Sequence, residues 1–197
     1  MCTNLAHLPS WDPESGALNV IIETAKGNRN KLKFDGERCL FKLSKVLPRG
    51  MAFPFDFGFI PSTTADDGDP LDVLVLMDEP TVAGCLVPCR LLGVLEAEQG
   101  AGKKIERNDR LIAVAMDCRD HKDLHGLQEV SANLLQEIEH FFTAYHDLDG
   151  KLFRTLGRRG PRRAAKLVRE AAERFAEANV YGEVEGNGKP RTRTAAQ

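Results

Sequence analysis

The sequence predicts an α+β fold in which a small β-barrel is followed by helices that pack against it. Two observations lead to this prediction. Short apolar segments separated by turn residues fill residues 18–116, and such spacing is typical of a small closed or nearly closed barrel. Beyond residue 130 the apolar positions recur at helical spacing instead. Strands first and helices last indicate the α+β class.

Length and composition favour a single domain. The chain of 197 residues can enclose one sizeable core, which we place at 1–182, and we expect the polar stretch 183–197 to be a mobile tail. The formal net charge of −2 gives no general argument for nucleic-acid binding. No apolar run is long enough to cross a membrane, and the first ten residues lack a signal-peptide pattern. The five cysteines form no Cys-x-x-Cys pair, so reduced thiols and a cytoplasmic location are expected.

Three strands are predicted in the first part of the chain. The β-branched run at 18–22 indicates a buried strand that is followed by Glu23. Residues 31–34 alternate lysine with apolar side chains, as a half-exposed strand does. Asp35-Gly36 is a hairpin signal, and residues 39–43 would form the partner strand. The two lysines of the first hairpin strand therefore share a face, which is either simply solvated or holds phosphate.

The middle of the chain is expected to supply one wall of a site and the remaining strands. Phenylalanines alternate with Pro54 and Gly58 in residues 53–60, which suits an extended, bent segment whose rings enter the core. The charged stretch 98–110 contains glycine and is predicted to be an exposed hairpin loop. Further strands are predicted at 71–77, 85–96 and 111–116.

Two helices are predicted in the last third of the chain. Apolar residues recur at helical spacing through 131–145, which indicates one amphipathic helix. Gly160-Pro161 opens a second helix, because proline is favoured in the first helical turn, and its apolar face continues to Phe175. Residues 147–150 are predicted to form a turn between the helices.

The main chemical signal is a group of aspartates that runs directly into the apolar strand at 73–76. Burying so many negative charges beside a strand is costly unless cations neutralise them. No lysine or arginine occurs between Gly50 and Cys89, so the compensation must come from a metal ion or from distant segments. Carboxylate oxygens are hard ligands and favour Mg²⁺, Mn²⁺ or Ca²⁺ over zinc. The aspartates are Asp66, Asp67, Asp69 and Asp72.

Two other interpretations fit parts of this loop. Asp-Gly and Asp-Pro are ordinary turn formers, so an acidic surface turn is possible, but the direct junction with a buried strand disfavours it. A calcium-binding EF-hand needs glycine at its sixth position and glutamate at its twelfth. Counted from Asp67, these positions hold Asp72 and Asp78, which excludes the EF-hand pattern.

The stretch from Asp67 to Val73 resembles the signature of the soluble, magnesium-dependent, single-domain inorganic pyrophosphatases. The resemblance extends over residues 18–175, where further family motifs occur in the expected order. It implies a five-stranded barrel of the oligonucleotide-binding type flanked by helices. These motifs include Ile22-Glu23, Asn30-Lys31, Phe53-Pro54, Ile112-Ala113-Val114 and His140-Phe141-Phe142.

The resemblance also implies a reaction and a set of roles. The reaction is hydrolysis of pyrophosphate to two phosphates, with several Mg²⁺ ions, or Mn²⁺ as a substitute, and a water between two metals as nucleophile. Asp69 would take the proton from that water, and Glu23 would lie in the outer shell of a further metal. The family implies an oligomer, commonly a hexamer, and neither nucleic acid nor membrane as a partner. The metal ligands would be Asp67, Asp72 and, after a one-residue shift, Asp109; the phosphate-binding residues would be Lys31, Lys45, Arg110 and Tyr145.

Several positions depart from the family pattern, mostly around the substrate. Lys33 stands where the family has glutamate. Lys45 replaces an arginine, so a compact ammonium stands in place of a planar guanidinium. Phe57 replaces a tyrosine and His146 a lysine. Without a gap, Asn108 rather than Asp109 matches the family aspartate before the strand at 111–116.

Two alternatives to an active pyrophosphatase follow from these features. A weakened relative could bind phosphate-rich ligands or another protein, as the substitutions at 33, 57 and 108 suggest. Nucleic-acid binding would use the basic segment 154–169, but that segment also holds acids and an apolar helical face, so a solvated helix surface is the better interpretation.

Overall fold

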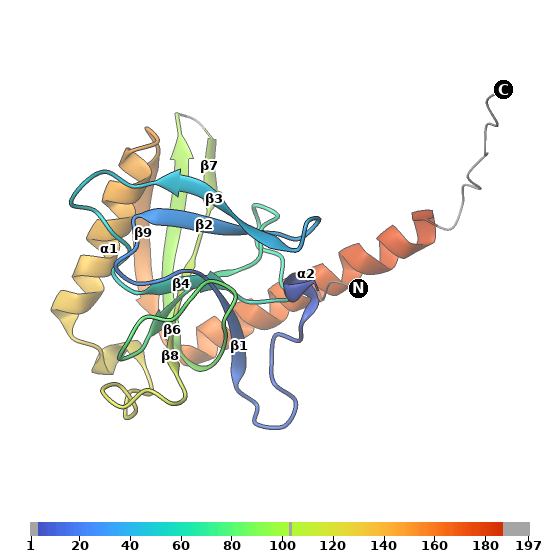
Figure 1. Ribbon diagram of the computed structural model, residues 1–197, viewed down its shortest axis with the longest axis horizontal. Helices are drawn as coiled ribbons and strands as arrows, with labels where there is room; N and C mark the ends of the chain where they lie inside the picture. The colour runs from blue at the N-terminus through green and yellow to red at the C-terminus, as the bar shows by residue number, and fades with distance from the viewer. Residues whose placement is uncertain (1–3, 103, 187–197) are drawn as a thin grey trace.

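The computed structural model describes residues 4–102 and 104–186, and its centre is a ring of five paired strands. Four of the pairings around the ring are antiparallel, and that between β5 and β8 is parallel. This ring and the two helices beside it confirm the predicted α+β barrel (Figure 1). In ring order the strands are β1 (Leu18–Thr24), β4 (Asp56–Phe59), β5 (Asp72–Leu76), β8 (Arg110–Ala115) and β6 (Leu86–Ala101), which pairs again with β1.

A separate two-stranded hairpin lies over the ring (Figure 1). It consists of β2 (Asn30–Asp35) and β3 (Leu40–Val46), as the Asp35-Gly36 signal predicted. Side chains of β1 attach it to the barrel. Thr24 Oγ1 accepts a hydrogen bond from Leu32 N–H at 3.0 Å, and Glu23 Oε1 accepts one from Phe34 N–H at 2.7 Å.

Two strands differ from the sequence prediction. Residues 98–110 are not mainly a loop, because β6 continues to Ala101 and the chain returns along it as β7 (Lys104–Arg107). The sequence reading also missed β9 (Leu152–Arg159), which pairs with β6 on its other side. Four of the eight β9 residues are arginine or glycine, and ion pairs such as Arg158–Glu139 hold the arginines along this strand.

The two helices pack on opposite parts of the extended sheet. Helix α1 (Ala132–Asp147) contacts β9 and confirms the predicted helix, and α2 (Pro161–Gly186) packs on β6 and extends away from the barrel (Figure 1). Residues 183–186 of the expected tail belong to α2, while 187–197 lie outside the described residues. Two 3-10 turns complete the fold, η1 (Leu5–His7) and η2 (Leu127–Glu129). Of the described helices, none is long and apolar enough to span a bilayer.

The phenylalanine-rich segment joins the barrel to α1. Phe53 and Phe57 are 2% exposed, and their rings contact Phe141 and Phe142 of the helix at centroid distances of 5.1 and 6.3 Å. Burying aromatic rings contributes a large part of the stability of a small core. The predicted entry of these rings into the core is therefore confirmed.

The close pairing of β1 with β4 requires a glycine. Gly58 pairs with Ile22, and a Cβ atom at position 58 would lie 2.1 Å from Ile21 O, a backbone atom. The same contact sets the register that joins β1 to β4 and β4 to β5, in which Ile21 faces Phe59 and Phe59 faces Asp72. Glu23 thereby comes close to Asp72.

Gly58→Ala should therefore destabilise the fold by about 3 kcal/mol, since an added methyl group forces two strands apart. Urea unfolding followed by circular dichroism measures the change. Gly157→Ala is the matched control, because Gly157 also lies in a strand but its added Cβ would meet only the Arg159 side chain at 3.7 Å. Equal losses of unfolding free energy in the two variants would show that the contact between Gly58 and β1 is not a steric constraint.

Candidate active site

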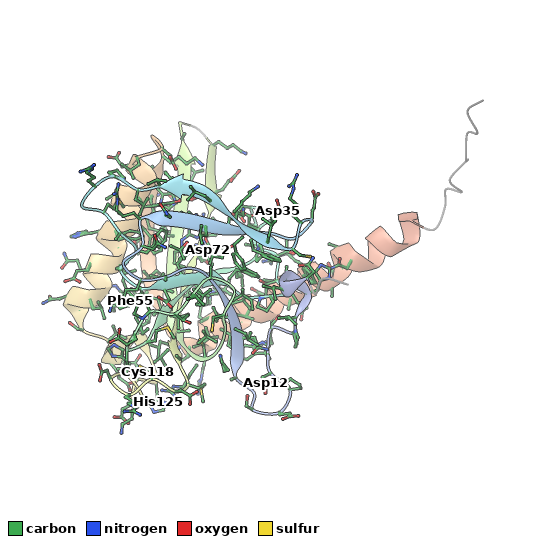
Figure 2. The ribbon with its side chains drawn as sticks, in the orientation of Figure 1. Asp12, Asp35, Phe55, Asp72, Cys118 and His125 are labelled. Carbon is green, nitrogen blue, oxygen red and sulfur yellow. The ribbon has the colours of Figure 1, made fainter. Side chains whose placement is uncertain are left out.

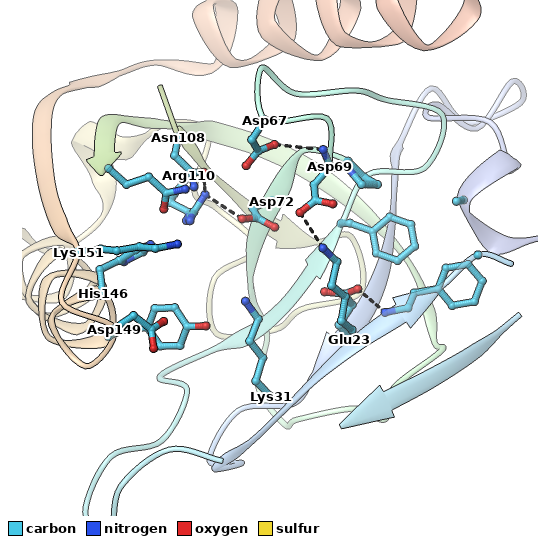
Figure 3. Close-up of a pocket in the computed structure, with 18 residues that line it drawn as sticks. Glu23, Lys31, Asp67, Asp69, Asp72, Asn108, Arg110, His146, Asp149 and Lys151 are labelled. Atoms are coloured by element: carbon cyan, nitrogen blue, oxygen red, sulfur yellow. Dashed lines mark hydrogen bonds and ion pairs between the residues drawn. The ribbon is translucent and has the colours of Figure 1, made fainter. Parts of the chain in front are cut away.

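A cavity of about 380 Å³ opens between the end of the ring, the β2–β3 hairpin and the turn after α1. Asp72, which contributes to it, lies near the middle of the molecule, whereas Asp12 and His125 lie at its edge (Figure 2). Figure 3 shows Glu23, Asp67, Asp69 and Asp72 on one side of this cavity and Arg110, Lys151 and His146 on the other. Lys33 also lines the cavity, paired with Asp69, and Asp149 lies near His146, so the site holds acidic and basic side chains close together.

The aspartate loop folds so that its acids face one cavity. Gly68 has a φ of 87°, which glycine adopts without strain, and the chain turns back there. Asp67 Oδ1 accepts a hydrogen bond from Asp69 N–H at 3.1 Å, which fixes the two aspartates relative to each other. Asp72 begins β5, and Glu23 reaches the same cavity from β1. The structure thus brings together Glu23, Asp67, Asp69 and Asp72.

Two of these acids face cations of the chain. Lys33 Nζ lies 2.7 Å from Asp69 Oδ2, and Arg110 Nη1 lies 2.8 Å from Asp72 Oδ2. Arg110 is only 4% exposed, lies 5.1 Å from the centre of the Phe142 ring and donates to Asn108 Oδ1. Its Nε has no hydrogen-bond partner among the described residues. The arginine is therefore held rigidly with one donor unused.

The remaining negative charge fits a divalent cation. Burial raises the pKa of Glu23 to about 7, and the nearby Asp72 carboxylate adds to this rise. Burial also raises the pKa of Asp67, as do the charges of Asp69 and Asp72. Both rises come first from burial, which disfavours the charged carboxylate, and a bound cation would favour that charged form.

The donor atoms match this charge. The hydrogen bonds and ion pairs of Asp67, Asp69 and Asp72 with described residues use one oxygen of each carboxylate. One oxygen of each is left, and carboxylate oxygens suit Mg²⁺ and Mn²⁺. Among the described residues, no three Asp, Glu, His or Cys side chains converge in a ready-made metal site. A metal held by these remaining oxygens therefore requires the carboxylates to move closer together.

Asn108, not Asp109, lines the cavity. Asp109 Oδ1 accepts hydrogen bonds from Ala97 N–H at 2.9 Å and Arg107 Nε at 2.6 Å, and its side chain is 8% exposed. The metal role that the resemblance gave to Asp109 would require it to leave both partners. The function proposed below omits Asp109 from the ligand set.

The basic side contains most of the phosphate-binding residues that the sequence indicated. Lys31, Arg110 and Tyr145 line the cavity together, and Lys31 Nζ lies 5.2 Å from the centre of the Tyr145 ring. Lys45 Nζ lies 4.7 Å from the same ring but forms an ion pair of 2.6 Å with Asp149. Lys45 therefore lies at the edge of the site and connects β3 to the turn after α1.

Sequence reasoning did not single out Asp149 and Lys151, which both line the cavity, and it named His146 only as a substitution. The predicted turn at 147–150 is present, with Gly150 N–H donating to Asp147 O at 2.9 Å. A turn that reverses the chain directly after the helix carrying Tyr145 was the signal that could have indicated Lys151.

Comparison with known proteins identifies the family. Residues 20–176 match the sequence profile described as inorganic pyrophosphatase. The chain belongs to the inorganic pyrophosphatase family.

Similar family members cover most of the chain. The chain is 34% identical to the inorganic pyrophosphatase of Synechocystis over 172 residues, and this alignment covers 87% of the chain and 99% of that protein. The Nostoc inorganic pyrophosphatase is 38% identical over 154 residues, with 78% of this chain and 88% of that protein covered. The crystal structure of the Thermus thermophilus inorganic pyrophosphatase superposes with a TM-score of 0.80 at 34% identity and covers 88% of this chain and 99% of that one. The resemblance seen in the sequence motifs is thus confirmed, as is the fold.

His146 should make stability depend on pH. Its side chain is 4% exposed, and burial, followed by the positive charges of Arg110, Lys31 and Lys151, lowers its pKa from 6.5 to about 4. Between these values the unfolded chain binds a proton that the folded protein excludes, so stability falls as the pH falls. Between about pH 7.5 and about pH 5 this group should cost the wild type about 2 kcal/mol of stability, and His146→Gln should not show this loss. Urea unfolding at the two pH values measures the difference. His125→Gln, on an exposed loop, should keep the wild-type dependence, and parallel curves for His146→Gln and wild type would contradict this assignment.

Proposed function

We propose that this member of the family hydrolyses inorganic pyrophosphate to two phosphates in the cavity between the aspartate loop and α1, with Mg²⁺ as cofactor. The observation that carries the proposal is that one cavity is lined both by the carboxylates of Glu23, Asp67, Asp69 and Asp72 and by the cations of Lys31, Arg110 and Lys151. Pyrophosphate carries several negative charges. Its hydrolysis therefore needs a metal-binding side for the attacking water and a basic side for the phosphoryl groups.

The aspartate loop would hold the cofactor. The proposed ligands are Asp67 and Asp72, each with one carboxylate oxygen left by its contacts with described residues, and Glu23 would act from the outer shell. When bound there, Mg²⁺, or Mn²⁺ in its place, supplies positive charge that polarises the phosphoryl group and acidifies water. The burial of Glu23 and Asp67 near other carboxylates supports this assignment, because a cation would favour the charged form of both groups.

Asp69 is the proposed general base. Its Oδ2 faces Lys33, and its Oδ1 has no hydrogen-bond partner among the described residues, so Oδ1 can take the proton of the attacking water. Lys31, Lys45, Arg110 and Tyr145 bind and orient the phosphoryl oxygens. Arg110 is buried and fixed by aromatic rings, so little side-chain entropy is lost when it binds.

The wider biology belongs to the same proposal. A cytoplasmic location, a homo-oligomeric assembly such as a hexamer, and the absence of nucleic-acid or membrane partners are inferred from the family resemblance. A near-neutral net charge of −2 agrees with a small-molecule substrate.

A second candidate function has its own observation. Lys33 and Arg110 already neutralise Asp69 and Asp72, and Asn108 supplies an amide where a carboxylate would hold metal more strongly. These features favour a relative that binds pyrophosphate or phosphate and turns it over weakly. The positive charges of Lys33 and Arg110 repel a metal ion and so lower the affinity of the site for it.

Asp69→Asn decides between the two functions. Phosphate release from pyrophosphate, measured with and without Mg²⁺, should require Mg²⁺ in the wild type and fall about 100-fold or more in the variant, because the proton acceptor is lost. Asp66→Asn is the matched control, since Asp66 belongs to the same loop but does not line this cavity; it should keep wild-type activity. Wild-type protein that binds pyrophosphate without releasing phosphate would reject hydrolysis and leave the binding function.

Removing the ammonium of Lys33 should strengthen metal binding. Lys33→Met leaves Asp69 without its 2.7 Å partner and should lower the Mg²⁺ dissociation constant roughly tenfold in isothermal titration calorimetry. Lys42→Met serves as the control, because Lys42 lies opposite Lys33 in the hairpin but pairs with Asp35 outside the cavity. Unchanged or weaker Mg²⁺ binding by Lys33→Met would show that Lys33 does not compete with the metal.

A further inference from the structure

His146 brings no positive charge to the basic side of the cavity. Its Nδ1 is 2.8 Å from Phe142 O, a carbonyl that can only accept, so Nδ1 carries the hydrogen. Burial lowers the pKa of this ring to about 4, so near pH 7 Nε2 carries a lone pair. The ring stacks on Phe153 at a centroid distance of 4.8 Å and is almost fully buried. An imidazole held in this way is neutral and acts as an acceptor, so it cannot attract a phosphate oxygen.

Lys151 enters the same cavity from the chain that follows. After α1 the backbone reverses at Gly150, whose φ is 64°, and Lys151 N–H donates to His146 O at 3.1 Å. This bond fixes the start of the lysine side chain beside the histidine. Figure 3 shows the Lys151 side chain beside that of His146, on the same side of the cavity as Arg110.

The ammonium of Lys151 is available to a ligand. Of the cations around the cavity, Lys33, Arg110 and Lys45 are paired with Asp69, Asp72 and Asp149. Lys151 forms no ion pair with any carboxylate in the described part of the chain, and Asp149, two residues before it, is already taken by Lys45 at 2.6 Å. Lys31 is likewise unpaired within that part and lies on β2, across the cavity from the turn (Figure 3). Two uncompensated ammonium groups thus reach one cavity from different elements.

We propose that Lys151 is a substrate-binding residue that contacts a phosphoryl group in this cavity and supplies there the cation that position 146 does not. The contact that anchors Lys151 is made by the backbone carbonyl at position 146, so it does not depend on the imidazole. The inference rests on the proposed function for the nature of the anion, a pyrophosphate or its phosphate product. A phosphate oxygen gains a charge-assisted hydrogen bond from each ammonium, so Lys31 and Lys151 together can hold the anion from two sides.

The test is titration of the full-length protein with inorganic phosphate by isothermal titration calorimetry, in metal-free buffer and again with Mg²⁺. Lys151→Met should weaken phosphate binding roughly tenfold, and Lys151→Arg should retain most of it because the charge is kept. Lys122→Met, on an exposed loop outside the cavity, is the matched control and should bind as the wild type does. Thermal unfolding verifies that all variants are folded.

The outcomes separate this inference from the proposed function. Phosphate binding by Lys151→Met equal to that of the wild type would overturn the inference, whether or not the protein hydrolyses pyrophosphate. Wild-type protein that releases no phosphate from pyrophosphate, but loses phosphate affinity in Lys151→Met, would reject hydrolysis and uphold Lys151 as an anion-binding residue. No detectable phosphate binding by the wild type, with or without Mg²⁺, would overturn the inference as well.

Discussion

Repulsion between carboxylates is the constraint on which the rest of this structure depends. Four acids share one cavity, and like charges at such short range destabilise a fold unless the backbone and opposite charges hold them. The barrel supplies the backbone part. The close pairing of β1 with β4 at Gly58 sets the position of Glu23, and the turn at Gly68 fixes Asp67 against Asp69. Two glycines thus place these acids, Gly58 because it leaves room for the neighbouring strand and Gly68 because it adopts a positive φ.

The opposite charges come from elements far away in sequence. Arg110 reaches Asp72 from β8 while lying against the rings of Phe142 and Phe153, and Lys33 reaches Asp69 from the hairpin. The Arg110–Asp72 pair adds less to stability than its Coulomb energy indicates, because the buried guanidinium loses water, and solvent screens the largely exposed Lys33–Asp69 pair. Their main effect here is to keep the acidic side of the cavity folded, and the same contacts oppose the entry of a metal ion. The same ion pairs therefore stabilise the protein without metal and lower its affinity for metal.

The sequence predicted what depends on local spacing and missed what depends on register. The aspartate loop, the barrel strands, the hairpin and both helices follow from periodicity and turn residues that lie close together in the chain. Whether Asn108 or Asp109 faces the cavity could not be decided in that way, because a shift of one residue in a strand exchanges its two faces. Strand β9 was missed because its arginines hid the alternation, with Phe153 buried between exposed neighbours. Lys151 escaped notice because its position depends on the reversal at Gly150.

The hairpin that carries Lys31, Lys33 and Lys45 forms no backbone ladder with the barrel, to which hydrogen bonds from the side chains of Thr24 and Glu23 connect it. Changes within this ribbon can therefore alter the cavity without disturbing the strand pairings on which folding depends. Two of the substitutions that separate this chain from the family pattern, at positions 33 and 45, lie on it. The ribbon is thus a unit on which natural variation can act separately, so that ligand preference can diverge among descendants while the scaffold is inherited unchanged.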